Sequence, residues 1–431
     1  MPAEERYGAS GDLVVRHARV LPMAFGGAVR GSPPTLPEVP DGAVAVVAGR
    51  IAYVGADTDL PAPLRALPTL DAAGRAVLPG LVDCHTHVPF AAWRADEHAE
   101  RLAGATYAAQ QGGEGGRPRG IARSAAQLAA AADADVLAFS HHRLGECLAA
   151  GTTTVELKSG YGLQAAQEMR LLALMQRLAA EVPQRVVRTG LFLHGPPPPP
   201  GREAWAQRVV SELMPRALAQ GLLDGVDAFV EAIAYRLEDA VPLIEAAQRA
   251  GLATHLHAAQ LEPSAAAAWA ASRGLTSVDH LDHLDPDGVR ALAASPTVAV
   301  LLPGATFLTG GATRPPARAL LAAGACVAVA TDLNPGTSPL TSLPEAAALA
   351  CRLFELTMEE ALAAVTVNAA AALGLGHEVG SLEVGKRGDL VVLEGDEPAL
   401  LVYRLGHPAV ETVVAAGRIA YRRSDGGAKA S

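Results

Sequence analysis

The stretch Leu78-Pro-Gly-Leu-Val-Asp-Cys-His-Thr-His87 is a short apolar run that ends in two histidines. Side chains of an extended segment repeat every two residues, so His85 and His87 face the same side of the chain. Histidine nitrogens are common ligands of zinc and iron. Two histidines at this spacing are as often structural as metal-binding, so their role depends on what the rest of the chain brings to them.

Seven further short apolar runs follow this one, and Ala- and Leu-rich amphipathic stretches separate them. This alternation is typical of a parallel sheet built from βα units. Eight units over about 250 residues predict a TIM (β/α)8 barrel, an α/β fold. A doubly wound sheet is the alternative, but it would carry a Gly-rich turn after the first strand, where His85-Thr-His87 stands instead. The predicted strands cover residues 81–85, 152–157, 187–193, 226–231, 253–257, 277–280, 298–302 and 327–331, and predicted helices include 125–150, 165–181, 237–250 and 317–323.

The two ends of the chain resemble each other. Val47-Ala-Gly-Arg-Ile-Ala-Tyr53 and Ala415-Ala-Gly-Arg-Ile-Ala-Tyr421 are nearly the same, and both read as hairpins that turn at the glycine. We therefore expect one small β-sandwich domain built from residues 1–75 and 380–431, with the barrel domain at 76–379. Two unrelated edge hairpins are the alternative. The Gly-rich segment 110–119 is predicted to be a mobile loop over the barrel mouth, without helix or strand.

Composition excludes several classes of protein. Half of the 431 residues are hydrophobic, which favours a large buried core over disorder. The net charge of -10 and the lack of a basic stripe argue against a nucleic-acid surface. No run of about 18 apolar residues predicts a membrane span. The polar N-terminus and four scattered cysteines, which we expect to be buried reduced thiols, indicate a cytoplasmic protein.

Ionisable residues stand at the ends of seven of the eight predicted strands. In a TIM barrel the active site is built at these carboxyl ends. His257 and Asp332 occupy strand ends equivalent to that of His85, which favours a metal site over a structural pair. The loop Ala330-Thr-Asp-Leu-Asn-Pro-Gly336 would by itself be an ordinary turn, but its place in the barrel makes Asp332 a predicted ligand and proton acceptor. The strand-end residues are His85, Lys158, His194, Glu231, His257, His280 and Asp332.

With these residues in place, the chain resembles the amidohydrolase superfamily and, within it, the imidazolonepropionase family. The general resemblance rests on Pro79-Gly-Leu-Val-Asp-Cys-His-Thr-His87, the later histidines, Asp332 and the segment 380–392. The closer resemblance rests on segments 101–107, 256–260 and 298–305, and above all on Val155-Glu-Leu-Lys-Ser-Gly-Tyr-Gly162 and Thr331-Asp-Leu-Asn-Pro-Gly-Thr-Ser338.

The resemblance implies a homodimeric enzyme that hydrolyses a small cyclic substrate, 4-imidazolone-5-propanoate, to N-formimidoyl-L-glutamate in histidine degradation. It implies one zinc or iron ion held by His85, His87, His257 and Asp332. Relatives with two metals have a carboxylated lysine at the end of strand four, where this chain has Glu231. Asp332 would move the proton, and His280 would orient water or stabilise the oxyanion. The substrate would be bound by Arg94, through its guanidinium, and by Tyr161, His194, Gln260, Asn334, Gly336 and Thr337.

Three departures from the family pattern bear on this expectation. Ala259 replaces a frequent acidic residue, and Gln260 stands where some members have Glu, so this side chain hydrogen-bonds without shuttling protons. The Gly-rich segment 110–120 matches the family pattern only in part, and the residues around Glu231 differ from those usual in the family. One rival is a cyclic-amidine deaminase, against which Gln260 argues because such enzymes use a Glu at that place. The other is a non-catalytic barrel, against which the intact ligand set argues.

Overall fold

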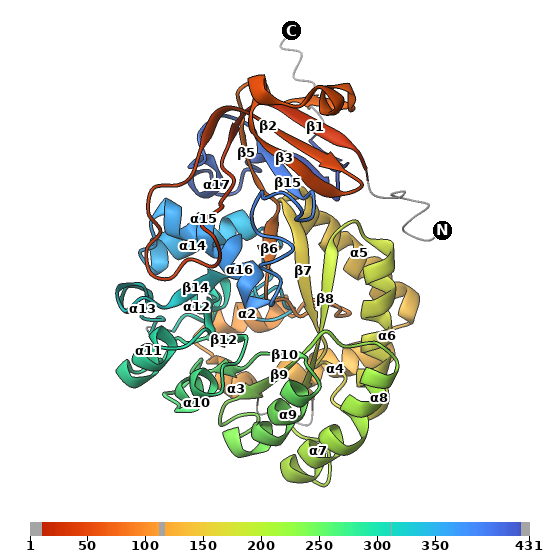
Figure 1. Cartoon of the computed structure of the whole chain (residues 1–431). Coiled ribbons are helices and arrows are strands. Elements are labelled where there is room, and N and C mark those ends of the chain that lie inside the picture. Colours follow the sequence, from red (N-terminus) through yellow and green to blue (C-terminus); the bar gives the residue numbers. More distant parts are fainter. Residues whose placement is uncertain (1–10, 112–116, 312, 424–431) are drawn as a thin grey trace.

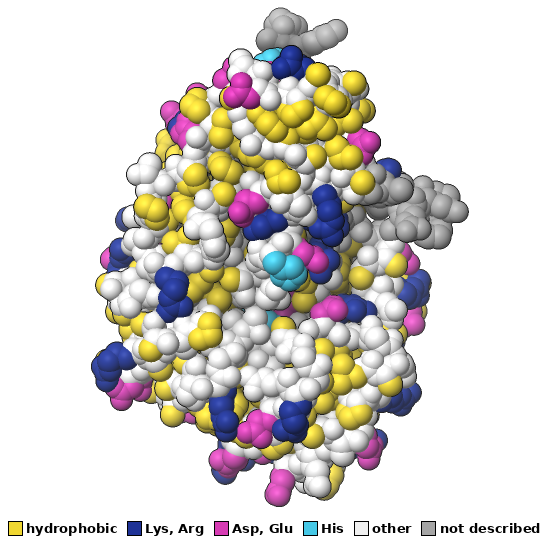
Figure 2. All heavy atoms as spheres, in the orientation of Figure 1, with side chains coloured by type: hydrophobic (Ala, Val, Ile, Leu, Met, Phe, Trp, Pro, Cys, Tyr) yellow, Lys and Arg dark blue, Asp and Glu magenta, His cyan; other side chains and the backbone are white. Residues whose placement is uncertain are grey.

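The computed structural model describes residues 11–111, 117–311 and 313–423. It consists of a barrel ringed by helices and a smaller β-domain, which joins residues from both ends of the chain (Figure 1). On the face shown in Figure 2, hydrophobic side chains gather over the small domain, and charged side chains of both signs are scattered over the barrel. None of the helices in the described ranges combines the length and apolar composition that a bilayer crossing requires.

The barrel strands follow one another in chain order, and every neighbouring pair is parallel. The ring closes because Thr86 pairs in parallel with Leu333, and the His87 amide donates to the Leu333 carbonyl at 2.9 Å. This closure confirms the predicted TIM barrel over an open doubly wound sheet. The strands are β6 (Leu81–Asp83), β7 (Thr152–Lys158), β8 (Arg185–Leu193), β9 (Gly225–Val230), β10 (Ala253–Thr254) with β11 (His257–Ala258), β12 (Ser277–His280), β13 (Val298–Leu301) and β14 (Cys326–Val329).

Helices cover the outside of this ring, because their Ala and Leu faces pack against the apolar strands. The helices of the first half are α2 (Ala95–Leu102), α3 (Tyr107–Gln111), α4 (Gly120–Ala130), α5 (Asp133–Ala149), α6 (Ala165–Glu181), α7 (Arg202–Arg208), the π-helix η3 (Val209–Leu213), α8 (Met214–Ala219) and α9 (Leu237–Arg249). Those of the second half are α10 (Ala266–Ser272), α11 (Pro286–Ala293), α12 (Pro303–Thr309), α13 (Ala317–Ala322), α14 (Leu343–Leu353), α15 (Met358–Ala364), α16 (Val367–Ala372) and α17 (Leu400–Tyr403).

Two predictions about local structure are wrong. The single helix expected at 125–150 is two helices, because Ala131 and Ala132 are extended with ψ of 145° and 149°. The break places Asp133 in the first turn of α5, where the helix dipole favours a carboxylate. The segment 110–119 was expected to lack helix, yet Gln110 belongs to α3, and its side chain donates to the Glu97 carbonyl at 2.7 Å. Residues 112–116 of that segment lie outside the described residues.

The small domain is one sheet of eight strands drawn from both termini, in the order β17-β16-β15-β5-β1-β2-β3, with β4 beside β1. Its two ends share an apolar core that includes Val15, Ile51, Val77, Leu390 and Val414, as expected for a sandwich. Two short 3-10 helices, η1 (Asp57–Asp59) and η2 (Ala62–Ala66), follow β3. The strands are β1 (Leu13–Val20), β2 (Val39–Val47), β3 (Arg50–Ala56), β4 (Thr69–Asp71), β5 (Ala76–Pro79), β15 (Leu390–Leu393), β16 (Val410–Ala415) and β17 (Arg418–Arg422).

The two similar hairpins stand at opposite ends of the strand order, β2 with β3 at one end and β16 with β17 at the other. Both turns have left-handed backbone, with φ of 50° and 75° at Ala48 and Gly49 and 46° and 76° at Ala416 and Gly417. Gly11, which precedes β1, bridges the two turns, because its amide donates to the Ala416 carbonyl and its carbonyl accepts from the Gly49 amide. The division into 1–75 with 380–431 and 76–379 stays a prediction. Residues 1–10 and 424–431 lie outside the described residues, and the pairing of β5 with β1 and β15 would put the first boundary after Pro79.

The cysteines are free thiols, of which Cys84, Cys147 and Cys326 are buried and Cys351 is partly exposed. Cys84 and Cys326 belong to the apolar cluster at the end of the barrel near α16. Burial raises the pKa of Cys84 well above its usual value, so this thiol stays neutral and packs as an apolar side chain.

The crossing from the small domain into the barrel depends on Gly80, which lies between β5 and β6. A Cβ at this position would come within 2.0 Å of Thr153 Oγ1 and 2.7 Å of Thr153 Cγ2. We expect Gly80→Ala to lower the free energy of unfolding by about 1–3 kcal/mol, the usual effect of overpacking. Gly145→Ala is the control, because it adds a methyl group in open space on α5 and favours the helix. Urea unfolding of both variants tests this, and equal midpoints would contradict it.

Candidate active site

Four predicted metal ligands meet at the carboxyl end of the barrel. His85 and His87 come from the first strand and its extension, His257 from β11, and Asp332 from the loop after β14. The Nε2 atoms of His85 and His87 are 3.2 Å apart, and those of His87 and His257 are 3.5 Å apart. Asp332 Oδ1 lies 3.2 Å from His87 Nε2 and 3.5 Å from His85 Nε2. All four side chains are buried.

These distances fit a bound metal ion. Zinc holds nitrogen ligands at about 2.0–2.1 Å, so ligand atoms at tetrahedral corners are about 3.4 Å apart. Asp332 Oδ1 is buried without a hydrogen-bond partner in the described part of the chain, although it faces the histidine nitrogens. Burial lowers the pKa of His85 and His87 well below the usual value, which keeps both rings in the neutral form that binds metals. The donor set therefore fits a metal ion.

Carboxylates behind the cluster orient two of the histidines. Asp279 Oδ2 on β12 lies 2.6 Å from His85 Nδ1, and Asp227 Oδ2 on β9 lies 3.0 Å from His257 Nδ1. A carboxylate beside Nδ1 favours the tautomer that carries the proton on that nitrogen, which leaves the lone pair of Nε2 toward the cluster. Both aspartates lie inside predicted strands, and the sequence analysis assigned neither of them a role.

Lys158 lies among these carboxylates at the end of β7. Its Nζ is 2.8 Å from Asp227 Oδ2, 2.9 Å from Glu156 Oε2 and 3.8 Å from Asp279 Oδ2, and all four side chains are fully buried. Burial by itself lowers the pKa of Lys158, but the carboxylates of Asp227, Glu156 and Asp279 outweigh it and raise the pKa above its usual value. Lys158 is therefore an ammonium ion inside the barrel.

His280 stands next to the cluster, at the end of β12. Its ring centroid is 5.2 Å from that of His257 and 5.7 Å from that of His85. Its backbone is left-handed, with φ of 78°, and its buried Nδ1 has no hydrogen-bond partner among the described residues. Such backbone strain is common at functional sites. Burial lowers the pKa of His280 well below its usual value, so the ring is neutral and offers one nitrogen as a hydrogen-bond donor and the other as an acceptor.

The loop that carries Asp332 is organised by Asn334. The Asn334 amide nitrogen donates to the Asp332 carbonyl at 2.7 Å, and its oxygen accepts from the backbone amides of Gly336 and Thr337 at 2.8 and 2.7 Å. Asp332 itself has a φ of 53°. Asn334 was expected to touch substrate, yet its amide is fully used in holding this turn. Its main contribution here is to position the Asp332 carboxylate.

A cavity of about 330 Å³ opens beside the cluster and is lined by most of the predicted substrate residues. The His194 ring stacks on His87 with centroids 5.2 Å apart and an interplanar angle of 19°, and its Nδ1 lies 3.1 Å from the Gly160 carbonyl. Tyr161 is buried next to both rings, and burial raises its pKa above the usual value. The lining consists of His87, Arg94, Tyr107, Ile121, Tyr161, His194, Phe229, His257, Gln260, His280, Asp332, Asn334 and Thr337.

Arg94 lines this cavity with one end of its guanidinium. Its Nη1 donates to the Gly120 carbonyl at 2.7 Å and to Ser124 Oγ at 2.6 Å, and its Nε lies 3.1 Å from Glu97 Oε2. These contacts use Nη1 and Nε, so among the described residues Nη2 is the guanidinium nitrogen without a hydrogen bond or ion pair. A Cβ on Gly336 would overlap the guanidinium, so Gly336 lies against Arg94 and does not line the cavity.

Gln260 reaches the cavity from the loop after β11, and Glu231 shapes that loop. Glu231 Oε1 accepts from the Gln260 amide at 2.6 Å and from the Leu261 amide at 3.2 Å. Burial raises the pKa of Glu231 to about 7. Glu231 thus holds the loop after β11. Among the described residues, the groups that could hold a metal ion consist of histidines and aspartates and do not include Glu231.

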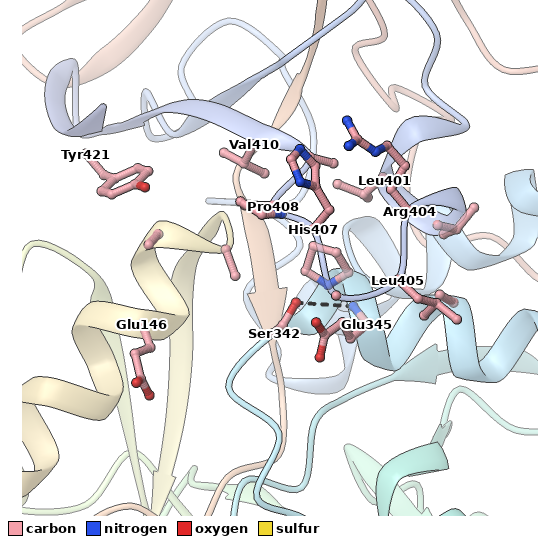
Figure 3. Close-up of a pocket in the computed structure, with 17 residues that line it drawn as sticks. Glu146, Ser342, Glu345, Leu401, Arg404, Leu405, His407, Pro408, Val410 and Tyr421 are labelled. Carbon is pink, nitrogen blue, oxygen red and sulfur yellow. Dashed lines mark hydrogen bonds between the residues drawn. The ribbon is translucent and has the colours of Figure 1, made fainter. Parts of the chain in front are cut away.

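Three cavity residues were not assigned a role from the sequence: Tyr107, Ile121 and Phe229. Tyr107 is the last residue of the segment 101–107, which was used for the family resemblance but not to predict a cavity residue. A larger hollow of about 840 Å³ lies where α17 and β16 meet α5 and α14 (Figure 3). It contains no predicted site residue, and much of its lining is Ala, Leu, Val and Pro. The predicted site residues therefore gather at the histidine cluster and not in the larger hollow.

The chain is similar to a family model and to named proteins over most of its length. Residues 76–420 match the model of the Amidohydrolase family. A protein of Polaromonas sp. named imidazolonepropionase is 42% identical over 413 residues, which cover 95% of each chain. One from Cupriavidus pinatubonensis with the same name is 44% identical over 396 residues, 91% of this chain and 92% of its own.

Solved structures share the fold at low identity. An atrazine chlorohydrolase from Arthrobacter aurescens, complexed with zinc and atraton, superposes with a TM-score of 0.73 at 18% identity over 94% of each chain. An adenosine deaminase from Xanthomonas campestris with bound zinc gives 0.66 at 21% identity, over 95% of this chain and 92% of its own. Together with the family match and the relatives above 40% identity, these findings show that the chain belongs to the amidohydrolase family and, within it, to the imidazolonepropionases.

Proposed function

We propose that the protein hydrolyses the ring C–N bond of 4-imidazolone-5-propanoate and releases N-formimidoyl-L-glutamate, a step of histidine degradation. The name shared by the relatives at 40–44% identity supports this substrate. The observation that carries the proposal is the convergence of three histidine Nε2 atoms and Asp332 Oδ1 beside a cavity that Arg94 also lines. Such a cavity offers a hydrolytic centre and a cation for a substrate carboxylate in one place.

We propose that His85, His87, His257 and Asp332 hold one metal ion, zinc or iron. Such an ion, when bound, lowers the pKa of water to about 7 and polarises a carbonyl group. The distances between the four ligand atoms support a single site. Among the described residues, two of the three groups of possible ligands share His85, and the third is in contact with the Lys158 ammonium through Asp227.

In the proposed mechanism Asp332 carries the proton, and His280 acts on the water or on the carbonyl oxygen. Burial raises the pKa of Asp332 to about 7, so its carboxyl group can take a proton from the attacking water near neutral pH. The new bond joins water oxygen to the ring carbonyl carbon, and Asp332 then returns the proton to the leaving ring nitrogen. His280 has an unpartnered Nδ1 and a neutral ring, which suits it to orient water or to stabilise negative charge on the carbonyl oxygen.

The remaining cavity residues are proposed to orient the substrate. Arg94 would bind the propanoate through Nη2. Arg101 lies close enough to add a second positive charge, because burial and the charge of Arg94 lower its pKa. Tyr161, His194, Gln260 and Thr337 line the walls, where their polar groups can bind the ring. Asn334 and Gly336 would act by shape, the first by holding the Asp332 turn and the second by letting the guanidinium approach.

The direct test is incubation of the purified protein with freshly prepared 4-imidazolone-5-propanoate while its ultraviolet absorbance is followed. We expect a loss of absorbance that disappears after chelation and returns with added Zn²⁺ or Fe²⁺. Ammonia is measured in the same sample, because a deaminase would release it and ring opening does not. A metal-loaded, folded protein without absorbance loss would contradict the proposed substrate, while the family assignment would stand.

Arg94→Met tests recognition of the propanoate. We expect KM to rise by about 10- to 150-fold with a smaller change in kcat, because a hydrogen bond to a charged group contributes about 1.5–3 kcal/mol. Arg123→Met is the matched control, since Arg123 binds Asp96 outside the cavity. Steady-state kinetics of both variants, after circular dichroism confirms folding, give the answer. An unchanged KM in folded Arg94→Met would reject this role.

A cytoplasmic location and assembly as a homodimer stay predictions, tested by cell fractionation and by light scattering.

A further inference from the structure

Lysine is rare in this chain and one of its lysines is in the middle of the barrel. Of 35 basic residues only three are lysines, at positions 158, 386 and 429. The Lys158 side chain is fully buried, with Nζ within 2.9 Å of both Asp227 Oδ2 and Glu156 Oε2. A fully buried lysine is uncommon unless it is paired, so this position calls for a specific reason.

The carboxylates around Lys158 are those that orient the proposed metal ligands. Asp227 touches His257 at 3.0 Å and Lys158 at 2.8 Å through the same oxygen, Oδ2. Asp279 Oδ2 contacts His85 at 2.6 Å and faces Lys158 at 3.8 Å. One ammonium ion thus lies close to two carboxylates, each of which contacts a different histidine of the cluster.

The other contacts of these carboxylates leave little freedom for a different arrangement. Ser277 Oγ donates to Asp279 Oδ1 at 2.6 Å, and the Ala228 amide donates to Asp227 Oδ1 at 2.7 Å. Glu156 on β7 accepts from Thr189 Oγ1 at 2.5 Å. The oxygens that face the histidines, Asp279 Oδ2 and Asp227 Oδ2, are therefore also the ones that face Lys158.

Three buried carboxylates without a cation would repel one another. Asp227, His257 and Asp279 bring ligand atoms within 4.8 Å of one another, a spacing that could hold a metal ion. The Lys158 ammonium contacts Asp227 and faces Asp279, and it supplies positive charge beside these two carboxylates. Carboxylation of Lys158, which would let it bridge two metals, would instead place a fourth negative charge among three carboxylates.

We infer that Lys158 is a positioning residue, whose ammonium group acts as a built-in cation in place of a second metal and holds Asp227 and Asp279 in line with His257 and His85. Through these aspartates it sets which nitrogen of each histidine faces the proposed metal. The inference rests on the proposed metal site at His85, His87, His257 and Asp332.

The test measures metal binding by the full-length protein, independently of catalysis. Zn²⁺ affinity is measured by competition with a chelator, and the visible spectrum of the Co²⁺-loaded protein reports ligand geometry. We expect Lys158→Met to weaken Zn²⁺ binding by about 10- to 100-fold, the usual effect of losing the support of ligating histidines, and to change the Co²⁺ spectrum. Lys386→Met is the control, because Lys386 binds Ser381 and the Gly376 carbonyl near the small domain.

A second variant separates positioning from simple charge balance and covers the case in which Lys158→Met does not fold. Glu156→Gln with Lys158→Met removes one anion and one cation from the same strand, so the net charge of the cluster is unchanged. We expect this double variant to bind Zn²⁺ weakly and to keep an altered Co²⁺ spectrum. Wild-type affinity and spectrum in either folded variant would overturn the inference. If wild type and Lys386→Met bind no metal, the proposed metal site has failed instead.

Discussion

Asp332→Asn is expected to lower kcat by about 10²- to 10⁴-fold at saturating metal, because an amide cannot accept and return the proton during ring opening. The substitution should leave the loop intact. Asparagine tolerates the left-handed backbone found at Asp332, and the bond from Asn334 is made to the Asp332 carbonyl, which is unchanged. Activity is followed by ultraviolet absorbance, and metal content is measured in the same preparation.

Asp282→Asn is the matched control for this experiment. Asp282 is also a buried carboxyl group at the carboxyl end of the barrel, but it accepts a hydrogen bond from Thr306 Oγ1 at 2.6 Å and is not part of the cavity lining. We expect little change in kcat for this variant. If Asp332→Asn retained wild-type kcat with metal bound, the proton would have to be carried by another group, and the roles given to Asp332 would be wrong.

The barrel was predictable because its strands are short apolar runs with turn residues between them. Each predicted strand overlaps an observed one, and the Ala- and Leu-rich stretches form the outer helices. The break between α4 and α5 was missed because Ala131 and Ala132 have no sequence feature that stops a helix. The signal lay after them, where Asp133 and Asp135 are suited to the first turn of a new helix.

The convergence of His85, His87, His257 and Asp332 was predictable because these residues stand at strand ends, but the residues behind them were not found. Asp227 and Asp279 lie within strands whose other residues are mostly apolar, and such runs were read as core. A charged side chain inside a fully buried strand needs a partner, so Glu156, Asp227 and Asp279 could have been matched with Lys158. Which carboxylate meets which histidine depends on the barrel register, which one sequence does not give.

The cavity lining was only partly predictable for a similar reason. The sequence motif that contains Asn334 and Gly336 marks a functional loop, but does not separate residues that touch a ligand from those that shape the turn. Asn334 uses its amide within the loop, and Gly336 provides room for Arg94. Tyr107 lines the cavity although it belongs to α3 and not to the end of a strand.

Removal of the metal is expected to abolish activity and to lower thermal stability. Without a cation, four buried donor atoms face one another at 3.2–3.5 Å. At free metal 1,000-fold above the dissociation constant, binding adds about 4 kcal/mol to the free energy of unfolding. Chelated protein should therefore show background activity and a lower Tm, and added Zn²⁺ should restore both. The double variant His85→Ala with His87→Ala is the control, because added Zn²⁺ should change neither quantity.

The pH dependence of metal binding gives this prediction a second, independent measurement. Burial raises the pKa of Asp332 to about 7 in the metal-free protein, and a carboxyl group must lose its proton to bind a metal. Below that pH the proton competes, so Zn²⁺ affinity should fall by about tenfold per pH unit from pH 7 to pH 5, while above it this contribution should be flat. In Asp332→Asn the part of the slope due to this carboxyl group should vanish. An equal slope in both proteins would show that Asp332 is not a ligand, even if chelation removed all activity.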